Sequence, residues 1–408
     1  MKCGLLGRKL GHSYSPQIHQ YLGPYPYDLF EKEPEEIAMF LRNGDFTGIN
    51  VTIPYKKDVI PFLDELSPKA VKMGSVNTII RRPDGTLFGH NTDYFGFHSM
   101  VLRSGITVPG KKVLVLGTGG TSNTAVKVLE DLGATVITVS RSGKNNYQNL
   151  HQHKDAAVIV NTTPVGMYPN TGATPVDLTV FPKLEGVLDV IYNPARTQLL
   201  LDAAKLGLPH ENGLWMLVAQ AKEAAEYFTG KSLPDSLIED VYRKMSAKMQ
   251  NIVLIGMPGC GKSTVASLLA EKLGRISADA DQKIEEMAGK TIPEIFAEDG
   301  EAVFRELETK VLSDLGKQSQ LIIATGGGCV TKSRNYPLLH QNGSIFWITR
   351  DLDLLATDGR PLSLDQKMTD MYAIRKPLYQ EFADHIIDNN GTFQDTVRKI
   401  LTILEEDL

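Results

Sequence analysis

The nine residues GMPGCGKST at positions 256–264 have the types and spacing of a loop that binds phosphate. They follow an apolar run, NIVLI at 251–255, and precede a helical pattern, which is the context that this motif requires. Glycines at such a turn let backbone N–H groups surround phosphate oxygens, and the helix N-terminus adds a favourable dipole. Lys262 is expected to reach the β- and γ-phosphates, and Ser263 to bind Mg²⁺. The motif predicts ATP or GTP binding but does not name the acceptor.

A second glycine loop, Gly117-Thr118-Gly119-Gly120, follows the strand pattern KKVLVL and resembles a dinucleotide-binding turn, with Ser122 in place of the last glycine. An NAD site has Asp or Glu at the end of the next strand. Here the strand ATVITV is followed by Ser140 and Arg141, and a guanidinium in place of a carboxylate favours the 2′-phosphate of NADP. An exposed loop arginine without a ligand is the alternative.

The nucleotide-binding residues predicted by these two loops fall into two sets. They are Gly117, Gly119, Gly120, Thr121, Ser140 and Arg141 for the dinucleotide, and Gly256, Gly259, Cys260, Gly261, Lys262, Ser263 and Thr264 for the triphosphate.

Composition limits the classes of protein to consider. The 408 residues favour two or three domains, and 42% hydrophobic content is enough to build full cores. A net charge of −5 argues against a nucleic-acid or membrane-surface binder. We find no signal-peptide pattern and no apolar run of about 20 residues that could span a bilayer. Three scattered cysteines favour neither disulfides nor zinc, so we expect a reduced, cytoplasmic protein.

The strand–loop–helix pattern occurs twice, once at each glycine loop, and predicts an α/β chain with two nucleotide-binding units. Residues 1–100 alternate short strands with turns and predict a substrate-binding unit with a mixed sheet, completed by the helical pattern at 214–235. Residues 101–213 predict a Rossmann-like, doubly wound parallel sheet. A linker is expected at 236–250, and a P-loop domain of the nucleoside-monophosphate-kinase type at 251–408.

Motifs after the P-loop indicate an acceptor. DAD at 279–281, FAEDGEAVFRELE at 296–308, ATGGGCV at 324–330, GRPLS at 359–363 and RKPLYQEFAD at 375–384 follow in order. With the loop they resemble shikimate kinase over residues 251–408. The resemblance implies that Asp279 helps to hold Mg²⁺ through water, that Asp281 binds and activates a ring hydroxyl, and that Arg305 and Arg375 bind the carboxylate of shikimate. It further implies substrate contact at Gly326, Gly327 and Gly328, and a lid arginine, Arg360, that reaches the transferring phosphoryl group. The lid is short, lacks an arginine just before it and has Ser363 at a usually apolar position, which puts its contacts with adenine in doubt.

The N-terminal motifs GHSYSPQIH, GINVTIPYKK, GSVNTI, GHNTDYFGF, NTTPVGM, DVIYNP and GLWMLVAQ resemble shikimate dehydrogenase throughout 1–235. The resemblance implies that Ser13 and Ser15 bind the substrate carboxylate, and that Thr52, Asn77, Asp93 and Gln220 bind ring hydroxyls, with Tyr192 nearby. Lys56 and Asp93 form the catalytic pair. The adjacent Lys57 is an alternative to Lys56, but the spacing N-V-T-x-P-x-K favours Lys56. The alternative for Asp93 is that it is only a turn residue without a catalytic role.

The two resemblances together imply a bifunctional enzyme of the shikimate pathway of aromatic amino-acid biosynthesis. It would reduce 3-dehydroshikimate to shikimate with NADPH and then phosphorylate the 3-hydroxyl of shikimate with ATP and Mg²⁺. The alternatives are a dehydrogenase whose kinase-like half is a degenerate ATP-binding regulatory module, and a quinate or shikimate dehydrogenase that runs oxidatively with NAD. A nucleic-acid module conflicts with the acidic balance. The oligomeric state stays open and is compatible with a monomer.

Overall fold

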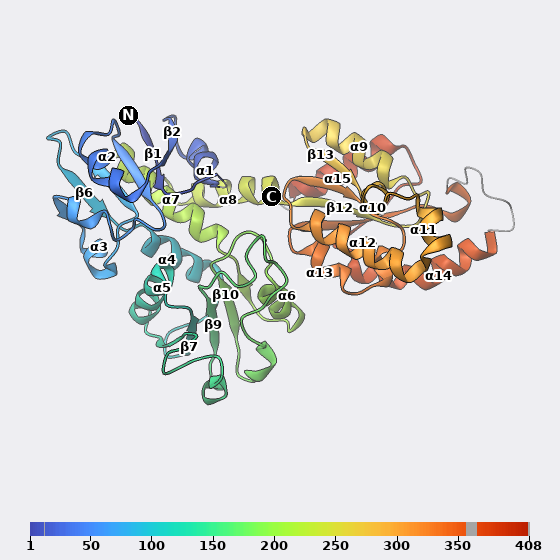
Figure 1. Ribbon diagram of the computed structural model, residues 1–408, viewed down its shortest axis with the longest axis horizontal. Coiled ribbons are helices and arrows are strands. Elements are labelled where there is room, and N and C mark those ends of the chain that lie inside the picture. The colour runs from blue at the N-terminus through green and yellow to red at the C-terminus, as the bar shows by residue number, and fades with distance from the viewer. Residues whose placement is uncertain (12, 356–364, 407–408) are drawn as a thin grey trace. The chain divides into compact units, whose positions relative to one another are not determined.

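A computed structural model describes residues 1–11, 13–355 and 365–406 of the chain. It divides into two compact units, each a mixture of helices and strands, which confirms the predicted α/β class (Figure 1). The first unit comprises Met1–Val165, Thr174–Tyr192 and Asp202–Met245, and the second comprises Gly166–Ala173, Asn193–Leu201 and Ser246–Leu408. None of the helices in the described ranges is long and apolar enough to cross a membrane.

The N-terminal sheet of the first unit is mixed. Its strand order is β2-β1-β3-β5-β6-β4, with β1 Cys3–Gly7, β2 Tyr27–Glu31, β3 Gly48–Val51, β4 Glu65–Leu66, β5 Thr78–Arg81 and β6 Leu87–His90. β5 is antiparallel to both β3 and β6, pairing Asn50 with Thr78 and Thr78 with His90. The start of β5 therefore lies at the same sheet edge as the ends of β3 and β6. This edge brings together three motifs that are separate in the sequence, namely GINVTIPYKK, GSVNTI and GHNTDYFGF.

Helices close around this sheet. They are α1 Ser15–Leu22, α2 Ile37–Asn43, α3 Pro68–Met73, α4 Asp93–Arg103 and α7 Leu214–Thr229. A Cβ atom added to Gly96 of α4 would lie 2.6 Å from the carbonyl oxygen of Met216 in α7, so glycine allows the two helices to approach closely. That approach sets the spacing between Asp93, at the start of α4, and Gln220, on α7.

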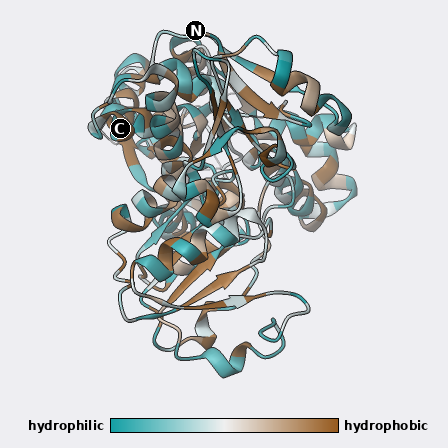
Figure 2. Ribbon diagram, turned by 90° about the vertical axis from the view of Figure 1, so that its left-hand side faces the viewer, coloured by the Kyte–Doolittle hydropathy of each residue, from teal (hydrophilic) through white to brown (hydrophobic). Residues whose placement is uncertain are grey.

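The second sheet of this unit is entirely parallel, as predicted for residues 101–213. Its order is β11-β10-β9-β7-β8, with β7 Lys112–Leu116, β8 Thr135–Val139, β9 Val158–Asn161, β10 Gly186–Asp189 and β11 His210–Glu211, accompanied by α5 Gly120–Asp131 and α6 Gln198–Lys205. The strand order reverses beside β7, and in open α/β sheets ligands bind at this point, outside the carboxyl ends of the strands. The strands are strongly hydrophobic, brown in the lower part of Figure 2, because the central ones are buried on both faces.

The second unit is built on a third parallel sheet, in the order β13-β14-β12-β15-β16. Its strands are β12 Asn251–Ile255, β13 Ile276–Asp279, β14 Leu321–Ala324, β15 Gly343–Thr349 and β16 His385–Asp388. Its helices are α9 Lys262–Leu273, α10 Ala280–Ala288, α11 Ile292–Glu298, α12 Gly300–Gly316, α13 Asn335–His340, α14 Asp365–Phe382 and α15 Phe393–Glu406. β12 is the central strand, so the phosphate-binding loop after it has neighbours from both halves of the sheet.

The predicted linker at 236–250 is mainly helical. It forms α8, Ser236–Met249, in which Ile238, Val241 and Met245 are buried. The charged residues of this stretch indicated a helix, and the apolar positions between them bury one of its faces.

Candidate functional site

A cavity of about 440 Å³ in the first unit collects most of the predicted dehydrogenase residues. Its lining includes Ser13, Ser15, Thr52, Lys56, Asn77, Asp93, Tyr192 and Gln220, together with Thr121 of the glycine loop. Residues from β1 to α7 thus meet at one place, although they are spread over more than half of the chain. Lys57, the alternative to Lys56, is exposed and lies outside this lining.

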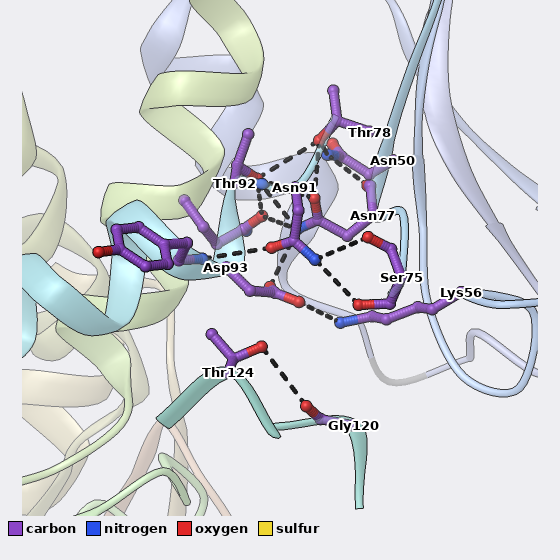
Figure 3. A network of polar contacts seen from close by, with 12 residues as sticks. Asn50, Lys56, Ser75, Asn77, Thr78, Asn91, Thr92, Asp93, Gly120 and Thr124 are labelled. Carbon is purple, nitrogen blue, oxygen red and sulfur yellow. Dashed lines mark hydrogen bonds and ion pairs between the residues drawn. The ribbon is translucent and has the colours of Figure 1, made fainter. Parts of the chain in front are cut away.

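Lys56 and Asp93 form an ion pair in this cavity (Figure 3). The Nζ of Lys56 donates to Oδ2 of Asp93 at 2.6 Å, and both side chains are largely covered, at 23% and 13% exposed. The Nδ2 of Asn77 donates to the other carboxylate oxygen of Asp93 at 2.9 Å. Asp93 is also the first residue of α4, where the positive end of the helix favours its negative charge. The carboxylate is therefore fixed and holds the ammonium in place.

A shell of neutral polar groups completes this arrangement. Thr92 donates its backbone N–H to Oδ1 of Asn77 at 2.8 Å, and its hydroxyl lies 3.3 Å from Oε1 of Gln220. Asn50 donates to the hydroxyl of Thr78 at 3.2 Å and lines the cavity. The sequence analysis missed Thr92 and Asn50, although both lie inside the quoted motifs, N-T-D and I-N-V-T.

The serines and Tyr192 lie on another part of the lining. The Oγ of Ser13 accepts the backbone N–H of Ser15 at 3.2 Å, which fixes the turn that leads into α1. Tyr192 makes an edge-to-face contact with Tyr14, with ring centroids 6.2 Å apart, and burial raises the pKa of its phenol. These are hydrogen-bonding groups that stay uncharged near neutral pH, suited to orienting a polar ligand.

The glycine loop after β7 opens toward the same cavity. Gly117 has φ +115°, a conformation that favours glycine, and the hydroxyl of Ser122 donates to its carbonyl at 2.7 Å. A Cβ atom on Gly119 or Gly120 would meet nothing within 4 Å, so the first turn of α5 presents open backbone on that side. The next residue, Thr121, lines the cavity. A dinucleotide on this loop would therefore end close to Lys56.

Ser140 and Arg141 follow β8, the strand that pairs with β7. Ser140 accepts the N–H of Gly143 at 2.8 Å, which shapes a tight turn, and Arg141 is exposed on that turn. No carboxylate stands in the sequence SRS that follows β8. The position that distinguishes NAD from NADP thus carries an exposed guanidinium beside the glycine loop.

A second cavity, of about 500 Å³, surrounds the P-loop in the second unit. The predicted residues that line it are Gly259, Gly261, Lys262, Ser263, Thr264, Asp279, Asp281 and Gly327. Gly256 and Cys260 belong to the loop but not to this lining, and Cys260 is fully buried. Arg360 lies outside the described residues.

The P-loop has the backbone that its glycines predict. Gly256, Gly259 and Gly261 have φ values of +145°, +78° and +96°, which L side chains rarely adopt. The Nζ of Lys262 donates to the carbonyls of Gly256 at 2.9 Å and Met257 at 3.0 Å. The ammonium is thus buried inside the curl of its own loop.

Two aspartates line the cavity beside this loop, Asp279 at the end of β13 and Asp281 in the first turn of α10. Asp279 accepts the hydroxyl of Ser263 at 2.7 Å and caps the N-terminus of α10. Burial, and secondarily the charge of Asp279, raises the pKa of Asp281. Oδ1 of Asp281 is buried without a hydrogen-bond partner. An unsatisfied buried carboxylate oxygen is costly unless a ligand donates to it.

The two predicted carboxylate-binding arginines are held on different elements. Arg305 of α12 donates to Glu308 at 2.9 Å, and Arg375 of α14 donates to the carbonyl of Gly327 at 3.1 Å. A Cβ on Gly326 would lie 2.5 Å from Oδ1 of Asp281, and one on Gly328 would lie 2.3 Å from the Arg305 guanidinium. The glycines therefore provide the space in which these charged groups meet.

Glu308 is a residue that the sequence analysis did not single out. Its side chain is fully buried, and burial raises the pKa of its carboxyl despite the neighbouring Arg305. The sequence did indicate a contact with Arg305, because an acid three residues after an arginine lies on the same helix face. The many charges of α12 suggested a solvated helix surface, and the buried pair was therefore not predicted.

Comparisons with known proteins agree with this division. Residues 258–405 match the family model described as shikimate kinase, and residues 5–79 match the shikimate dehydrogenase substrate binding domain. The shikimate dehydrogenase (NADP(+)) of Clostridium perfringens strain SM101 is 37% identical over 267 residues, covering 60% of this chain and 98% of that protein.

Solved structures give the same result. Shikimate dehydrogenase 1 of Peptoclostridium difficile is 36% identical with a TM-score of 0.55, covering 60% of this chain and 98% of that one. Shikimate 5-dehydrogenase of Thermus thermophilus, in complex with NADP(H) and shikimate, is 29% identical with a TM-score of 0.54, covering 60% and 99%. The chain therefore belongs to the shikimate dehydrogenase family over its N-terminal 60%, and it carries a shikimate kinase domain toward its C-terminus.

Proposed function

We propose that this protein is a bifunctional enzyme of the shikimate pathway, with NADP-dependent shikimate dehydrogenase and shikimate kinase activities on one chain. The observation that supports the proposal is that one cavity is lined by the Lys56–Asp93 pair and a second cavity by the P-loop and Asp281. The product of the first reaction is the substrate of the second. No channelling follows from this, because a shared chain raises local concentration only modestly unless a closed path exists.

In the dehydrogenase cavity, Lys56 is proposed as the proton donor. NADPH, when bound, supplies the hydride for the C3 carbonyl of 3-dehydroshikimate. The Lys56 ammonium stabilises the negative charge that grows on the carbonyl oxygen and transfers its proton there. Asp93 orients the ammonium, and Asn77 fixes Asp93. Ser13 and Ser15 bind the substrate carboxylate, and Thr52, Asn77, Asp93 and Gln220 bind its ring hydroxyls near Tyr192.

In the kinase cavity, the residues position substrates and balance charge. ATP supplies the phosphoryl group, and Lys262 leaves the loop carbonyls to contact its phosphates. Asp281 accepts the proton of the 3-hydroxyl, a role that suits its unpartnered Oδ1. Arg305 and Arg375 bind the carboxylate of shikimate by charge-assisted hydrogen bonds. Arg360 contacts the transferring group.

Mg²⁺ is proposed at Ser263 and Asp279, whose oxygens lie 2.7 Å apart. Within the described residues, no group of three or more His, Cys, Asp or Glu could hold a metal ion. Magnesium commonly keeps several waters and takes phosphate oxygens, so two protein groups are enough.

We also infer a cytoplasmic location, to which the buried, unpaired thiols of Cys3, Cys260 and Cys329 are suited.

A coupled assay tests the proposal directly. Purified protein is supplied with 3-dehydroshikimate, NADPH, Mg²⁺ and ATP, and the oxidation of NADPH and the release of ADP are followed together. Both signals should depend on 3-dehydroshikimate, and shikimate alone should support ADP release. NADPH oxidation without ADP release at saturating substrates would indicate the degenerate, regulatory kinase half instead.

The cofactor preference depends on Arg141. Replacing it with alanine should lower kcat/KM for NADPH by roughly ten- to a hundred-fold, because a charge-assisted contact with the 2′-phosphate is lost, and should leave kcat/KM for NADH nearly unchanged. Steady-state kinetics with both cofactors measure this. An NADP preference that survives the substitution would refute the role of Arg141, and a wild-type preference for NAD would favour the oxidative, quinate-type alternative.

Glu308→Gln should weaken shikimate binding to the kinase. The change keeps the shape of the side chain but removes the buried countercharge of Arg305, whose guanidinium then keeps the exposed Glu301 as its ionic partner. We expect KM for shikimate to rise by about ten-fold or more, with KM for ATP within two-fold of the wild type. Glu306→Gln, on an exposed position of the same helix, is the matched control. An equal effect of both substitutions would contradict the proposed role.

A further inference from the structure

The lining of the dehydrogenase cavity includes a cation that the proposed function leaves unassigned. Among the described residues that line it, the charged ones are Lys9, Lys56 and Asp93. The charges of Lys56 and Asp93 balance each other in their ion pair. Within the described ranges 1–11, 13–355 and 365–406, no carboxylate forms an ion pair with Lys9. The lining therefore carries an uncompensated positive charge, and that charge is on Lys9.

Lys9 lies close in the chain to the two serines of this cavity. Its neighbour Leu10 accepts the backbone N–H of Ser13 at 2.9 Å, and the Oγ of Ser13 accepts the N–H of Ser15 at 3.2 Å. Lys9, Leu10, Ser13 and Ser15 all line the cavity. The uncompensated charge is thus on the segment that carries the two hydroxyls proposed to bind the substrate carboxylate.

The backbone beside Lys9 is held in place from two sides. Glu31, the last residue of β2, accepts the N–H of Leu10 at 2.6 Å. A Cβ atom on Gly7, at the end of β1, would lie 2.8 Å from the side chain of Thr52, so the segment packs closely against another residue of the cavity. The backbone of this segment is therefore fixed, while the Lys9 side chain is exposed and can reach a ligand in the cavity.

The adjacent Arg8 shows the contrast with an ordinary surface cation. Its guanidinium contacts Glu33 through Nε at 2.9 Å and Nη2 at 2.8 Å, and it does not line the cavity. An exposed lysine without an ion pair is common on protein surfaces and by itself indicates nothing. Lys9 differs because it lines a cavity whose other charges cancel, and the proposed substrate of that cavity is an anion.

We propose that the Lys9 ammonium binds the carboxylate of 3-dehydroshikimate together with Ser13 and Ser15. Hydroxyl groups offer only neutral donors, whereas a charge-assisted hydrogen bond is about twice as strong. One uncompensated positive charge in the lining also matches the single negative charge of the substrate. This inference rests on the proposed dehydrogenase function and makes Lys9 a specificity-determining residue that favours acids over uncharged analogues.

The first test is steady-state kinetics of the full chain at low ionic strength. Lys9→Gln should raise KM for 3-dehydroshikimate by roughly five- to ten-fold and leave kcat and KM for NADPH within about two-fold of the wild type. Lys9→Arg keeps the charge and should stay close to the wild type. Lys57→Gln is the matched control, because it removes the same charge from an exposed position outside the lining and should have little effect.

Two further readouts would not respond to a merely structural role. The wild type should prefer 3-dehydroshikimate over its uncharged methyl ester, and Lys9→Gln should reduce this preference roughly five- to ten-fold, because the residue and the carboxylate are coupled. Since Lys9 is exposed, salt should screen its charge. Raising the ionic strength to about 1 M should therefore remove most of the difference in KM between the wild type and Lys9→Gln.

The remaining outcomes would overturn the inference or separate it from the proposed reaction. An unchanged KM in Lys9→Gln, or an equal rise for the acid and the ester, would overturn it. A rise confined to KM for NADPH would assign Lys9 to the cofactor and overturn it as well. Calorimetry with 3-dehydroshikimate alone repeats the comparison without turnover. An affinity that depends on Lys9 in a protein that does not reduce 3-dehydroshikimate would support the carboxylate site and refute the proposed reaction. Circular dichroism checks that the variants are folded.

Discussion

Lys56→Ala is expected to reduce the rate of 3-dehydroshikimate reduction by about a thousand-fold, because the side chain that donates the proton and balances the developing charge is removed. Asp93 would then be left without the ammonium that lies 2.6 Å from its carboxylate, inside a largely covered cavity. Phosphorylation of shikimate should continue at the wild-type rate. The measurement is the rate of NADPH oxidation at saturating substrates, with ADP release from added shikimate followed in parallel.

The neighbouring Lys57 provides a matched control. It is exposed and does not line the cavity, so Lys57→Ala should leave reduction within about two-fold of the wild type, as for most surface substitutions. A large loss in Lys57→Ala together with a small one in Lys56→Ala would reverse the assignment. The pH profile adds a second readout, since the limb that reports the proton donor should disappear with Lys56.

Lys262→Ala is expected to have the opposite selectivity. It should lower the rate of shikimate phosphorylation by at least about a hundred-fold, because a cation that neutralises the transferring phosphates is lost. Reduction of 3-dehydroshikimate should be unaffected. Initial rates of ADP release across a range of ATP concentrations would separate the loss of kcat from the loss of ATP affinity.

Lys272→Ala, at an exposed position near the end of the same helix, serves as the control and should retain both activities. If either Lys56→Ala or Lys262→Ala eliminated both activities in a folded protein, the two cavities would not work independently. Far-ultraviolet circular dichroism and thermal unfolding distinguish that result from a failure to fold.

Local sequence was sufficient for the features that depend on local geometry. KVLVLGTGG and NIVLIGMPGCGKS predicted two strand–loop–helix turns, because apolar runs followed by closely spaced glycines leave few other conformations. Asp279 was found through its motif and also caps α10. The mixed first sheet and the parallel second sheet were correctly predicted from the pattern of strands.

Residues whose partners come from distant elements were not predictable in this way. Glu308 depends on α12 burying the face that carries Arg305, and the charges of this helix pointed instead to a solvated surface. The contact between the guanidinium of Arg350 and the ring of Phe393, 5.5 Å from carbon to centroid, depends on β15 and β16 being neighbours in the sheet. Sheet order is set by packing between elements that are far apart in the chain, and a single sequence contains no direct record of it.

The hydrogen bonds of Lys262 have a consequence for turnover. If the buried ammonium had no other acceptor, dissociation of the nucleotide would leave its charge unpaired. An unpaired buried charge is costly, and this cost would slow dissociation. Here the carbonyls of Gly256 and Met257 accept it at 2.9 and 3.0 Å. On the proposed function, the side chain would exchange one set of oxygens for another as ADP departs. Product release is the slow step of many enzymes, and we expect that substitutions which remove these carbonyl contacts of Lys262 would slow it.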